Sequence, residues 1–449
     1  MRIKNLEEYQ KEKENFENSP ERFWEEKADT FKWNQKWNNV LEWDFHKANI
    51  NWFKGGKLNI TENCLDRHLT SKGEQIAIKW IANNPKEKNI DITYNDLHKQ
   101  VCKFSNVLRN KGVKKGDRIC LYMPMVPELA IAVLACARIG AIHSVVFAGF
   151  SAKSLSDRIN DAKCKGLITA DGGFRGNKIT PLKEIADEAM KKTPSIDFSI
   201  VLKRTNSNIG MEDTRDFWWH EEMKKSNNKC QAEIMDSEDK LFILYTSGST
   251  GKPKGIVHST AGYMVYAQYS FENVFQYNPG DLYWCTADIG WITGHTYIIY
   301  GPLLAGATTV MFEGVPTYPD AGRFWDIVEK NQINIFYTAP TAIRALEAKG
   351  NQYVRKYNVS TGIVSTYAGS GGSEGQAPVD GDLLSAKIAM ANCGLTISDN
   401  GLVSIFGGEA VSGDSVRQFS LGSPSPLISV NVQNLTIQYV KSATANSNP

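Results

Sequence analysis

Leu241-Phe242-Ile243-Leu244-Tyr245 runs directly into Thr246-Ser247-Gly248-Ser249-Thr250-Gly251-Lys252-Pro253-Lys254-Gly255, and this junction decides which fold the sequence predicts. The first five residues form a short apolar run of the kind that is buried in a sheet. The following residues combine glycines, which let backbone amides approach a ligand, with hydroxyl side chains and two lysines. We interpret the junction as a strand that ends in a polyphosphate-binding loop.

Two other interpretations of this loop are less compatible with its residues. A Walker A loop needs Gly at position 246 and Ser or Thr at position 253, but Thr246 and Pro253 stand there. A solvated Ser/Gly loop without a ligand would not require the two lysines or the preceding apolar strand. The pattern therefore favours an anion site that differs from that of the P-loop nucleotidases.

The same order of strand, loop and helix is predicted upstream of the junction. Residues 119–123, 141–147 and 166–170 are predicted as buried strands, and residues 127–139 and 181–191 as helices. This alternation predicts an α/β fold, with a mostly parallel sheet and helices on its faces. Ligands of such folds bind at the carboxyl ends of the strands, which is where the glycine-rich loop falls.

Composition excludes several classes of function. The chain has 449 residues, with 51 Lys+Arg against 49 Asp+Glu, and its net charge of +2 is not that of a nucleic-acid binder. The charged amino terminus does not resemble a secretory signal, and the longest apolar run, 129–137, is too short to span a membrane. We therefore expect a cytoplasmic protein. The eight cysteines form no C-x-x-C pair, so buried reduced thiols are expected, and no metal site is identifiable.

The character of the sequence changes near residue 360. All eleven tryptophans precede this point, and the last 90 residues contain nine charged residues, 12 Gly and 15 Ser. Residues 369–375 are predicted to be a flexible linker. Asp399-Asn400-Gly401 lies between two alternating segments and predicts a β-hairpin, and the alternation recurs at 428–432 and 435–439. The tail is therefore expected to be β-rich or poorly ordered.

The loop also resembles the phosphate-binding signature of the adenylate-forming enzymes. Further segments are similar to those of the AMP-forming acetyl-CoA synthetases: Trp52 to Asn59, Cys64 to His68, Tyr122 to Glu128, Val145 to Ser151, Trp284 to His295 and Tyr337 to Arg344. The resemblance extends from near residue 1 to about residue 359. It implies an extension typical of these synthetases at 1–70, an incomplete AMP-binding domain at 71–359, a linker at 360–380 and an unrelated tail at 381–449.

The resemblance implies a reaction in two steps, with Mg-ATP, acetate and CoA as substrates and no prosthetic group. Acetate attacks the α-phosphate of ATP, which gives acetyl-adenylate and pyrophosphate, and the CoA thiol then displaces AMP. Such chemistry needs positioning and charge neutralisation rather than a protein nucleophile. These small molecules are the expected partners, neither a membrane nor a nucleic acid is expected, and the oligomeric state is left open.

The resemblance also assigns roles to individual residues. The triphosphate would be held by Thr246, Ser247, Gly248, Ser249, Thr250, Gly251 and Lys252. The acyl pocket would be lined by Trp291, Ile292 and Thr293, although a buried apolar strand end is the alternative for this segment. CoA would contact Arg175, Gly176, Asn177, Lys178, Thr293 and Thr317, with Lys178 where the family usually has arginine and Thr317 where it usually has asparagine. His258, His295, Trp218 and Trp219 are interpreted as packing groups.

Past residue 359 the family pattern is lost. The adenine, ribose and magnesium segments, the small lid domain and its catalytic lysine cannot be placed, so no catalytic residue is assigned. Gly407 to Ala410 and Ser412 to Asp414 are only faint counterparts of two of these segments. We therefore expect a chain that descends from a ligase and whose ligase activity is impaired. The alternative is a non-catalytic nucleotide- or CoA-binding fragment, or a fused pseudo-enzyme.

Overall fold

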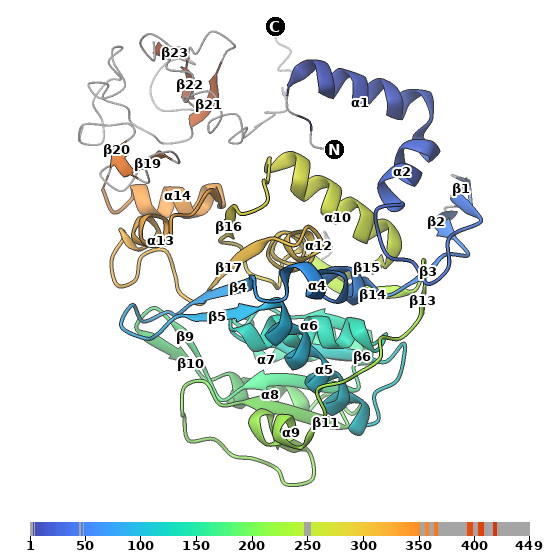
Figure 1. Ribbon diagram of the computed structural model, residues 1–449. Helices are drawn as coiled ribbons and strands as arrows, with labels where there is room; N and C mark the ends of the chain where they lie inside the picture. The colour runs from blue at the N-terminus through green and yellow to red at the C-terminus, as the bar shows by residue number, and fades with distance from the viewer. Residues whose placement is uncertain are drawn as a thin grey trace, which may run out of the picture. The chain divides into compact units, whose positions relative to one another are not determined.

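The structure, a computed structural model, describes residue 3, residues 5–44, 46–47, 49–246 and 253–350, and five short strands beyond residue 354. The chain divides into two compact units. The first contains residues 1–319 and 333–339, and the second contains residues 320–332 and 340–449. The expected α/β fold is confirmed in the first unit, in which helices flank two largely parallel sheets (Figure 1).

The larger sheet has seven strands, and all neighbouring strands are parallel except the last two. In spatial order they are β12 (Asp216–Trp218), β11 (Phe198–Leu202), β8 (Gly166–Ala170), β6 (Arg118–Tyr122), β7 (Ile142–Val145), β14 (Lys240–Thr246) and β15 (Lys254–Ser259). The strands predicted at 119–123, 141–147, 166–170 and 241–245 are β6, β7, β8 and β14.

Helices cover both faces of this sheet. The chain moves from β6 to β7 in one direction along the sheet and from β7 back past β6 to β8 in the other. Because such crossovers are right-handed, the two connecting helices, α6 (Pro127–Arg138) and α7 (Ala152–Ala162), lie on opposite faces. The predicted helix at 181–191 is α8 (Leu182–Met190), which contacts β8.

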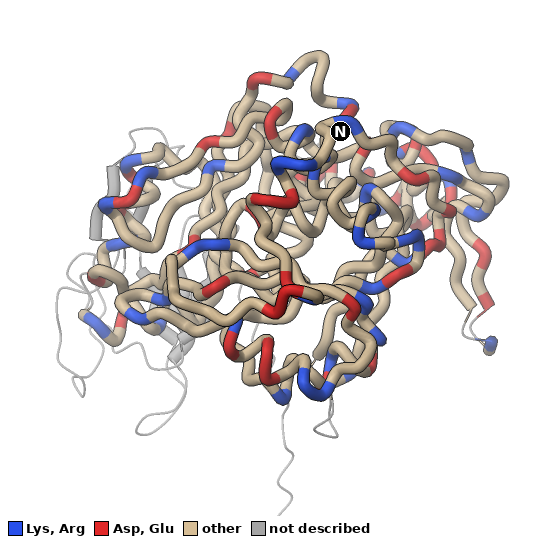
Figure 2. Tube along the Cα trace, turned by 90° about the horizontal axis from the view of Figure 1, so that it is seen from below, with Lys and Arg blue, Asp and Glu red and all other residues tan. Residues whose placement is uncertain are grey.

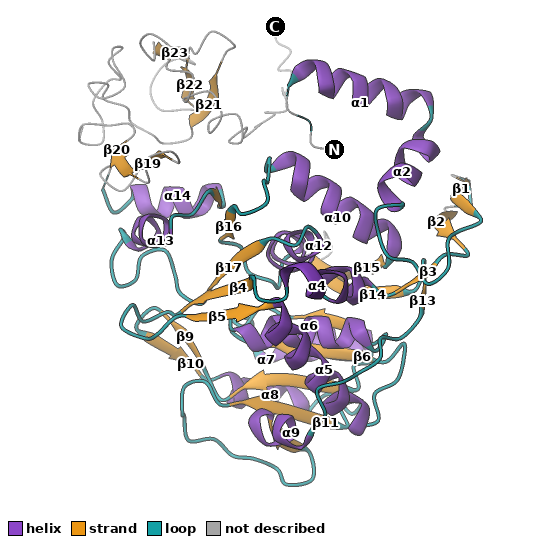
Figure 3. Ribbon diagram, in the orientation of Figure 1, coloured by secondary structure: helices purple, strands orange, loops and turns teal. Residues whose placement is uncertain are grey.

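The smaller sheet has five strands, of which only the edge pair β4–β5 is antiparallel. In order they are β18 (Ile335–Tyr337), β16 (Leu282–Cys285), β17 (Thr308–Phe312), β4 (Ile76–Ile81) and β5 (Ile90–Thr93). Helix α5 (Tyr94–Asn110) contacts β4 and β5, and it packs along α6, which contacts β6 and β7. The pair therefore lies between the sheets (Figure 3), and every residue of α6 except Glu128 is buried.

The chain after the glycine-rich loop differs from the expected order of strand, loop and helix. Residues 254–259 return as β15, antiparallel to β14, with Thr246 opposite Lys254. Unlike the predicted units upstream, this loop is therefore followed by a strand rather than by a helix. The β-branched pair Ile256-Val257 favours a strand, and the helix, α10 (Ala261–Val274), begins only after it.

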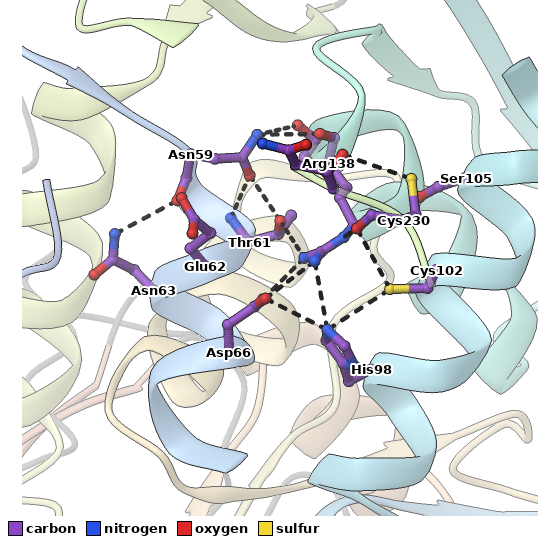
Figure 4. Close-up of polar contacts among 12 residues, drawn as sticks. Asn59, Thr61, Glu62, Asn63, Asp66, His98, Cys102, Ser105, Arg138 and Cys230 are labelled. Atoms are coloured by element: carbon purple, nitrogen blue, oxygen red, sulfur yellow. Dashed lines mark hydrogen bonds and ion pairs between the residues drawn. The ribbon is translucent and has the colours of Figure 1, made fainter. Parts of the chain in front are cut away.

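The amino-terminal region is anchored to the rest of the first unit by a buried polar cluster (Figure 4). The Asn59 side chain donates to the carbonyls of Ala137, Arg138 and Glu233 at 2.8 to 3.2 Å. Arg138, at the end of α6, donates from both terminal nitrogens to the Asp66 carboxylate, at 2.8 and 3.0 Å. His98 of α5 completes the cluster, with Nε2 lying 3.4 Å from Asp66.

The remaining elements of the first unit are short or peripheral. They are α1 (Leu6–Asn18), α2 (Pro20–Ala28), β1 (Asn39–Asp44), β2 (Asn49–Lys54), β3 (Lys57–Leu58), α3 (Ile60–Cys64), a 3-10 helix (Asp66–His68), α4 (Leu69–Lys72), β9 (Gly173–Arg175), β10 (Lys178–Thr180), α9 (Trp219–Lys225), β13 (Met235–Asp236), α11 (Ile292–Gly294), the π-helix η2 (His295–Tyr300) and α12 (Gly301–Leu304). The seven cysteines whose side chains the structure describes are free and buried, as expected. None of the helices in the described ranges is long and apolar enough to cross a membrane.

The second unit contains α13 (Arg323–Asn331), α14 (Pro340–Glu347) and two small antiparallel sheets. One sheet pairs β19 (Arg355–Asn358) with β20 (Ile363–Thr366), and the other contains β21 (Cys393–Ile397), β22 (Val403–Gly407) and β23 (Val416–Phe419). The hairpin predicted around Asn400-Gly401 is confirmed by the pairing of β21 with β22. The predicted linker at 369–375 and the alternating segments at 428–432 and 435–439 lie outside the described residues.

Candidate functional site

The loops that follow parallel strands of both sheets meet at one place in the first unit. The β9–β10 hairpin follows β8 in the larger sheet, and Asn83 follows β4 in the smaller one. The buried Asn83 side chain donates to the Gly176 carbonyl at 2.8 Å and accepts from the Gly176 amide at 3.0 Å. This reciprocal pair fixes the hairpin turn against the second sheet, at the strand ends where α/β proteins bind ligands.

The hairpin presents two cations side by side. Arg175 pairs directly with Lys178 across the β9–β10 ladder, and Gly176-Asn177 forms the two-residue turn. Gly176 has a φ of 62°, which glycine adopts without strain and which a type II′ turn requires at its first central position. Directly opposed residues project to the same face, where like charges repel. Because both side chains are exposed, this face is suited to an anion.

The segment after β17 lies against the same hairpin. A Cβ placed on Gly176 would lie 3.4 Å from the Val315 side chain and 3.5 Å from Tyr318. Thr317, between these two residues in the chain, is half-buried. The structure therefore brings Arg175, Gly176, Asn177 and Lys178 next to the segment that contains Thr317, although 140 residues separate Asn177 from Thr317 in the sequence.

Phe147, in the loop after β7, connects the hairpin with the predicted acyl-pocket segment. The Arg175 guanidinium lies 5.4 Å from the centre of the Phe147 ring. The centre of the Trp291 ring lies 6.4 Å from that of the Phe147 ring and 6.3 Å from that of the Phe150 ring. Arginine and tryptophan contacts with one aromatic ring are favourable, the first through a cation–π interaction and the second through ring packing. Residues predicted for two different substrates thus share one neighbour.

Asp288, in the loop after β16, is a carboxyl group next to this arrangement. Its Oδ1 accepts from the Gly290 amide at 2.7 Å, and Gly290 itself approaches the Phe147 backbone so closely that a Cβ there would lie 3.1 Å from the Phe147 nitrogen. Burial raises the pKa of Asp288 to about 6, against the opposing effects of the Gly290 amide and the Arg175 charge. Its carboxyl group therefore titrates near neutrality.

The segment predicted to form the acyl pocket does not form a closed pocket here. Trp291 and Ile292 are 48% and 45% exposed, and Thr293 is half-buried. The segment is also not a strand end, because Trp291 precedes the short helix α11, which continues into η2. The alternative interpretation of this segment as a buried strand end is therefore wrong. The roles predicted for the three side chains in an acyl pocket remain predictions.

The predicted phosphate loop is described only at its two ends. Thr246 is exposed at the carboxyl end of β14, whereas Ser247 to Lys252 lie outside the described residues. The pairing of Thr246 with Lys254 holds the ends of the loop together. The Tyr245 hydroxyl donates to Asp161 of α7 at 2.7 Å and so ties the end of β14 to a neighbouring helix. The described residues on either side of the loop are thus anchored to each other and to α7.

The histidines and tryptophans interpreted as packing groups do pack. His295 stacks on His143 with ring centres 5.4 Å apart, and both contact the Phe242 ring of β14. Burial lowers the pKa of His295 to about 4, which keeps its imidazole neutral. Trp219 stacks on Phe104 at 3.8 Å. The contacts of His295 hold η2, and with it the segment containing Trp291, against the larger sheet.

Comparison with protein families assigns the chain to a family. The AMP-binding enzyme family matches residues 65–429, and the family of acetyl-coenzyme A synthetase N-termini matches residues 9–64. The chain belongs to the AMP-binding enzyme family. The first match extends past residue 359, so the boundary that we predict there remains a prediction.

Curated relatives of this AMP-binding enzyme are acetyl-coenzyme A synthetases. Acetyl-coenzyme A synthetase 2 of Pseudomonas aeruginosa is 56% identical over 344 residues, which cover 76% of this chain and 53% of the relative. Acetyl-coenzyme A synthetase of Saccharophagus degradans is 56% identical over 338 residues, covering 75% of this chain and 52% of the relative. For the synthetase of Bdellovibrio bacteriovorus, identity is 53% over 336 residues. The chain thus spans about half the length of these relatives.

Phe147, Asp288 and Asn83 lie at the candidate site, although sequence reasoning gave them no role. Phe147 and Asp288 lie within segments that resemble the synthetases, which was the one signal available for them. Asn83 offered no signal, because its partner Gly176 is distant in the sequence. Lys and Arg are interspersed with Asp and Glu along the described chain (Figure 2), so the cationic pair at 175 and 178 is a local feature. Within the described ranges, no group of His, Cys, Asp or Glu residues could hold a metal ion.

Proposed function

We propose that this chain carries the CoA-binding and ATP-phosphate-binding parts of an AMP-forming acetate–CoA ligase. Mg-ATP, acetate and CoA are its proposed substrates. In the first step a carboxylate oxygen of acetate bonds to the α-phosphorus of ATP, and pyrophosphate leaves. In the second step the CoA sulfur bonds to the acyl carbon, its proton is released, and AMP leaves with the bonding electrons. Neither step requires a covalent bond to the protein.

The observation that supports this proposal most strongly is the position of Phe147. Arg175, proposed to meet the phosphates of the CoA nucleotide, and Trp291, proposed for the acyl site, contact the same ring from two loops. A ligase must bring the CoA thiol to the acyl group, so these two sites must be neighbours. Residues 175 and 291 approach the same ring only through the fold, and this proximity supports the family-based roles.

The remaining roles are those that the resemblance implies, and the charge and size of the side chains are compatible with them. Arg175 and Lys178 would neutralise CoA phosphates, while Gly176, Asn177, Thr293 and Thr317 would contact the rest of the nucleotide and its arm. The loop residues Thr246 to Lys252 would hold the triphosphate of ATP through backbone amides, hydroxyls and one ammonium group. Trp291, Ile292 and Thr293 would favour a short acyl chain. One methylene changes binding by only about 1 to 3 kcal/mol, so propionate is expected as a weaker substrate.

The sequence after residue 359 favours a second candidate function, that of a non-catalytic nucleotide- or CoA-binding protein, including a fused pseudo-enzyme. The adenine, ribose and lid-lysine segments cannot be recognised after residue 359, and the loss of such a preorganised charge costs about 10² to 10³ in rate. We therefore expect binding to exceed catalysis.

Isotope exchange between pyrophosphate and ATP in the presence of acetate separates the two functions. Exchange requires adenylation, so a protein that only binds nucleotide gives none. Calorimetric titrations with ATP and with CoA measure binding separately. Lys252→Ala should weaken ATP binding and Arg175→Ala should weaken CoA binding, each by about tenfold for a lost charged contact. Lys153→Ala, at an 82% exposed side chain on α7, is the control and should change neither. Absence of both binding events would contradict the proposal.

Further aspects of this proposal rest on the sequence. We propose a cytoplasmic location, with no membrane or nucleic-acid partner. We also propose that residues 1–70 form the synthetase-type extension and that residues 71–359 contain the binding sites. Residues 360–380 would then be a linker to an independent tail at 381–449. Fractionation of cells into soluble and membrane portions tests the location, and limited proteolysis between residues 360 and 380 tests the division.

A further inference from the structure

Arg204, which follows β11, lies at the junction of the loops that form the candidate site. Its Nε and Nη2 donate to the two carboxylate oxygens of Glu313 at 2.8 and 2.5 Å. Nη2 also donates to Glu87 at 2.9 Å. Glu313 follows β17 and its side chain has no exposed surface, while Arg204 is only 14% exposed. The guanidinium is thus a buried bidentate clamp on the segment that leads to Thr317.

The same guanidinium also lies over two aromatic rings, one on the hairpin and one on β4. Its central carbon lies 4.7 Å from the centre of the Phe174 ring and 5.3 Å from that of Trp80. Phe174 directly precedes Arg175 and pairs with Ile179 across the hairpin ladder. One side chain therefore holds β9 by stacking and the segment after β17 by an ion pair.

The backbone that carries Arg204 is itself fixed. The amides of Arg204, Thr205 and Ser207 donate to the carboxylate of Asp171 at 2.7 to 3.1 Å. Asp171 is 1% exposed and directly follows β8. The guanidinium is therefore presented from a rigid base, as the positioning of a binding site requires.

We infer that Arg204 is a positioning residue for the CoA nucleotide site. It holds the hairpin with Arg175 and Lys178 in a fixed register with the segment that contains Thr317. The inference rests on the proposed function for the identity of the ligand, but the clamp itself rests only on the contacts above. A lysine at 204 keeps the positive charge but loses both the bidentate fork and the stacked plane, so Arg204→Lys should release the hairpin.

Arg215 provides a matched control. It is 21% exposed and pairs with Glu212, Asp187 and Asp216, so it is a similarly shielded arginine in a carboxylate cluster. Its partners belong to the α8 and β12 region, whereas those of Arg204 belong to the candidate site. Arg215→Lys should therefore cost stability without affecting the hairpin. Phe174→Leu is a second test variant, because it removes the stacked ring and leaves the buried ion pair intact.

The first measurement does not depend on CoA binding. Amide hydrogen exchange in residues 173–180 should become faster by about tenfold or more in Arg204→Lys and in Phe174→Leu, because local opening of the hairpin becomes easier. Arg215→Lys should leave these amides unchanged. Unchanged exchange in Arg204→Lys and Phe174→Leu, or equal acceleration in Arg215→Lys, would overturn the inference whether or not the chain binds CoA.

The second measurement tests the coupling to Arg175. Calorimetric titration with CoA should show about tenfold weaker binding for Arg204→Lys and an ATP affinity within about twofold of the unaltered chain. The double variant Arg175→Ala/Arg204→Lys should lose less CoA affinity than the product of the two single losses, because part of the effect of Arg204 on CoA passes through Arg175. Fully multiplicative losses would overturn the inference. Failure of the unaltered chain to bind CoA would contradict the proposed function instead, and the exchange experiment would still decide the role of Arg204.

Discussion

At the scale of single residues, the Asp66–Arg138 pair stands out because it is buried and charged. The Arg138 side chain is only 4% exposed, and its partner Asp66 is 25% exposed. Asp66→Asn would leave the guanidinium without its counter-charge, and we expect the free energy of unfolding to fall by about 3 kcal/mol. Urea denaturation measures this change. Asp157→Asn breaks the exposed pair with Lys153 and should cost about 0.5 kcal/mol or less. Equal losses in the two variants would contradict the expectation.

His98 gives the same cluster a pH dependence. Hydrogen bonding to Asp66, aided by Cys102, raises the pKa of His98 from 6.5 to about 9, despite burial and the nearby Arg138. A raised folded-state pKa stabilises the fold fully below pH 6.5, and this contribution is lost as the pH rises through 9. His98→Asn should therefore lower the melting temperature at pH 6 and change it little at pH 10. A difference between the two proteins that grows with pH would contradict this.

At the scale of elements, the turn of the β9–β10 hairpin depends on Gly176. Its φ of 62° is left-handed, so Gly176→Ala should cost about 1 to 2 kcal/mol and, by distorting the hairpin, weaken CoA binding. Gly116→Ala is the control, because Gly116 has a φ of 85° and open space where a Cβ would lie. Both variants should lose comparable stability in urea, but only Gly176→Ala should lose CoA affinity by calorimetry. Equal CoA affinities would exclude a binding role for the turn.

The elements also show which parts of the fold can be predicted from sequence. β8 and α6 follow from local patterns, because an apolar run or a capped apolar segment indicates burial without knowledge of its partners. The second sheet cannot be predicted in this way, since β4 and β17 are far apart in the chain and become neighbours only by packing. β15 was not predicted from the sequence, because its pairing with β14 across the glycine-rich loop is not visible in a local pattern.

In the candidate site, too, some features could be predicted from local sequence and others depend on tertiary contacts. Arg175 and Lys178 could be named because they lie in a recognisable segment, and their cross-strand pairing is a local property of the hairpin. The raised pKa of Asp288 arises from burial among distant segments, and the function of Arg204 depends on Glu313 and Phe174, which are remote in the sequence. Interactions of this kind depend on tertiary structure, so no local sequence pattern predicts them.

At the scale of the whole molecule, β15 forms the last strand of the larger sheet among the described residues. Ile256 and Val257 on this strand are 46% and 48% exposed. An apolar edge strand is a template for pairing with another chain, so we expect the protein to self-associate at high concentration. Val257→Lys should reduce this association. Val274→Lys, at a 57% exposed position on helix α10, should not. Light scattering over a concentration series measures the effect, and identical curves for the two variants would contradict it.

Helix α6 has a consequence for how this molecule could move. A helix that is buried on nearly every side, between two sheets, cannot slide along one of them without disrupting its packing on the other. The sheets therefore form a stiff frame, and any adjustment on ligand binding would be confined to the loops at the strand ends. The backbone amides of α6 should be the last to exchange with deuterated solvent, because they open only when the entire frame comes apart.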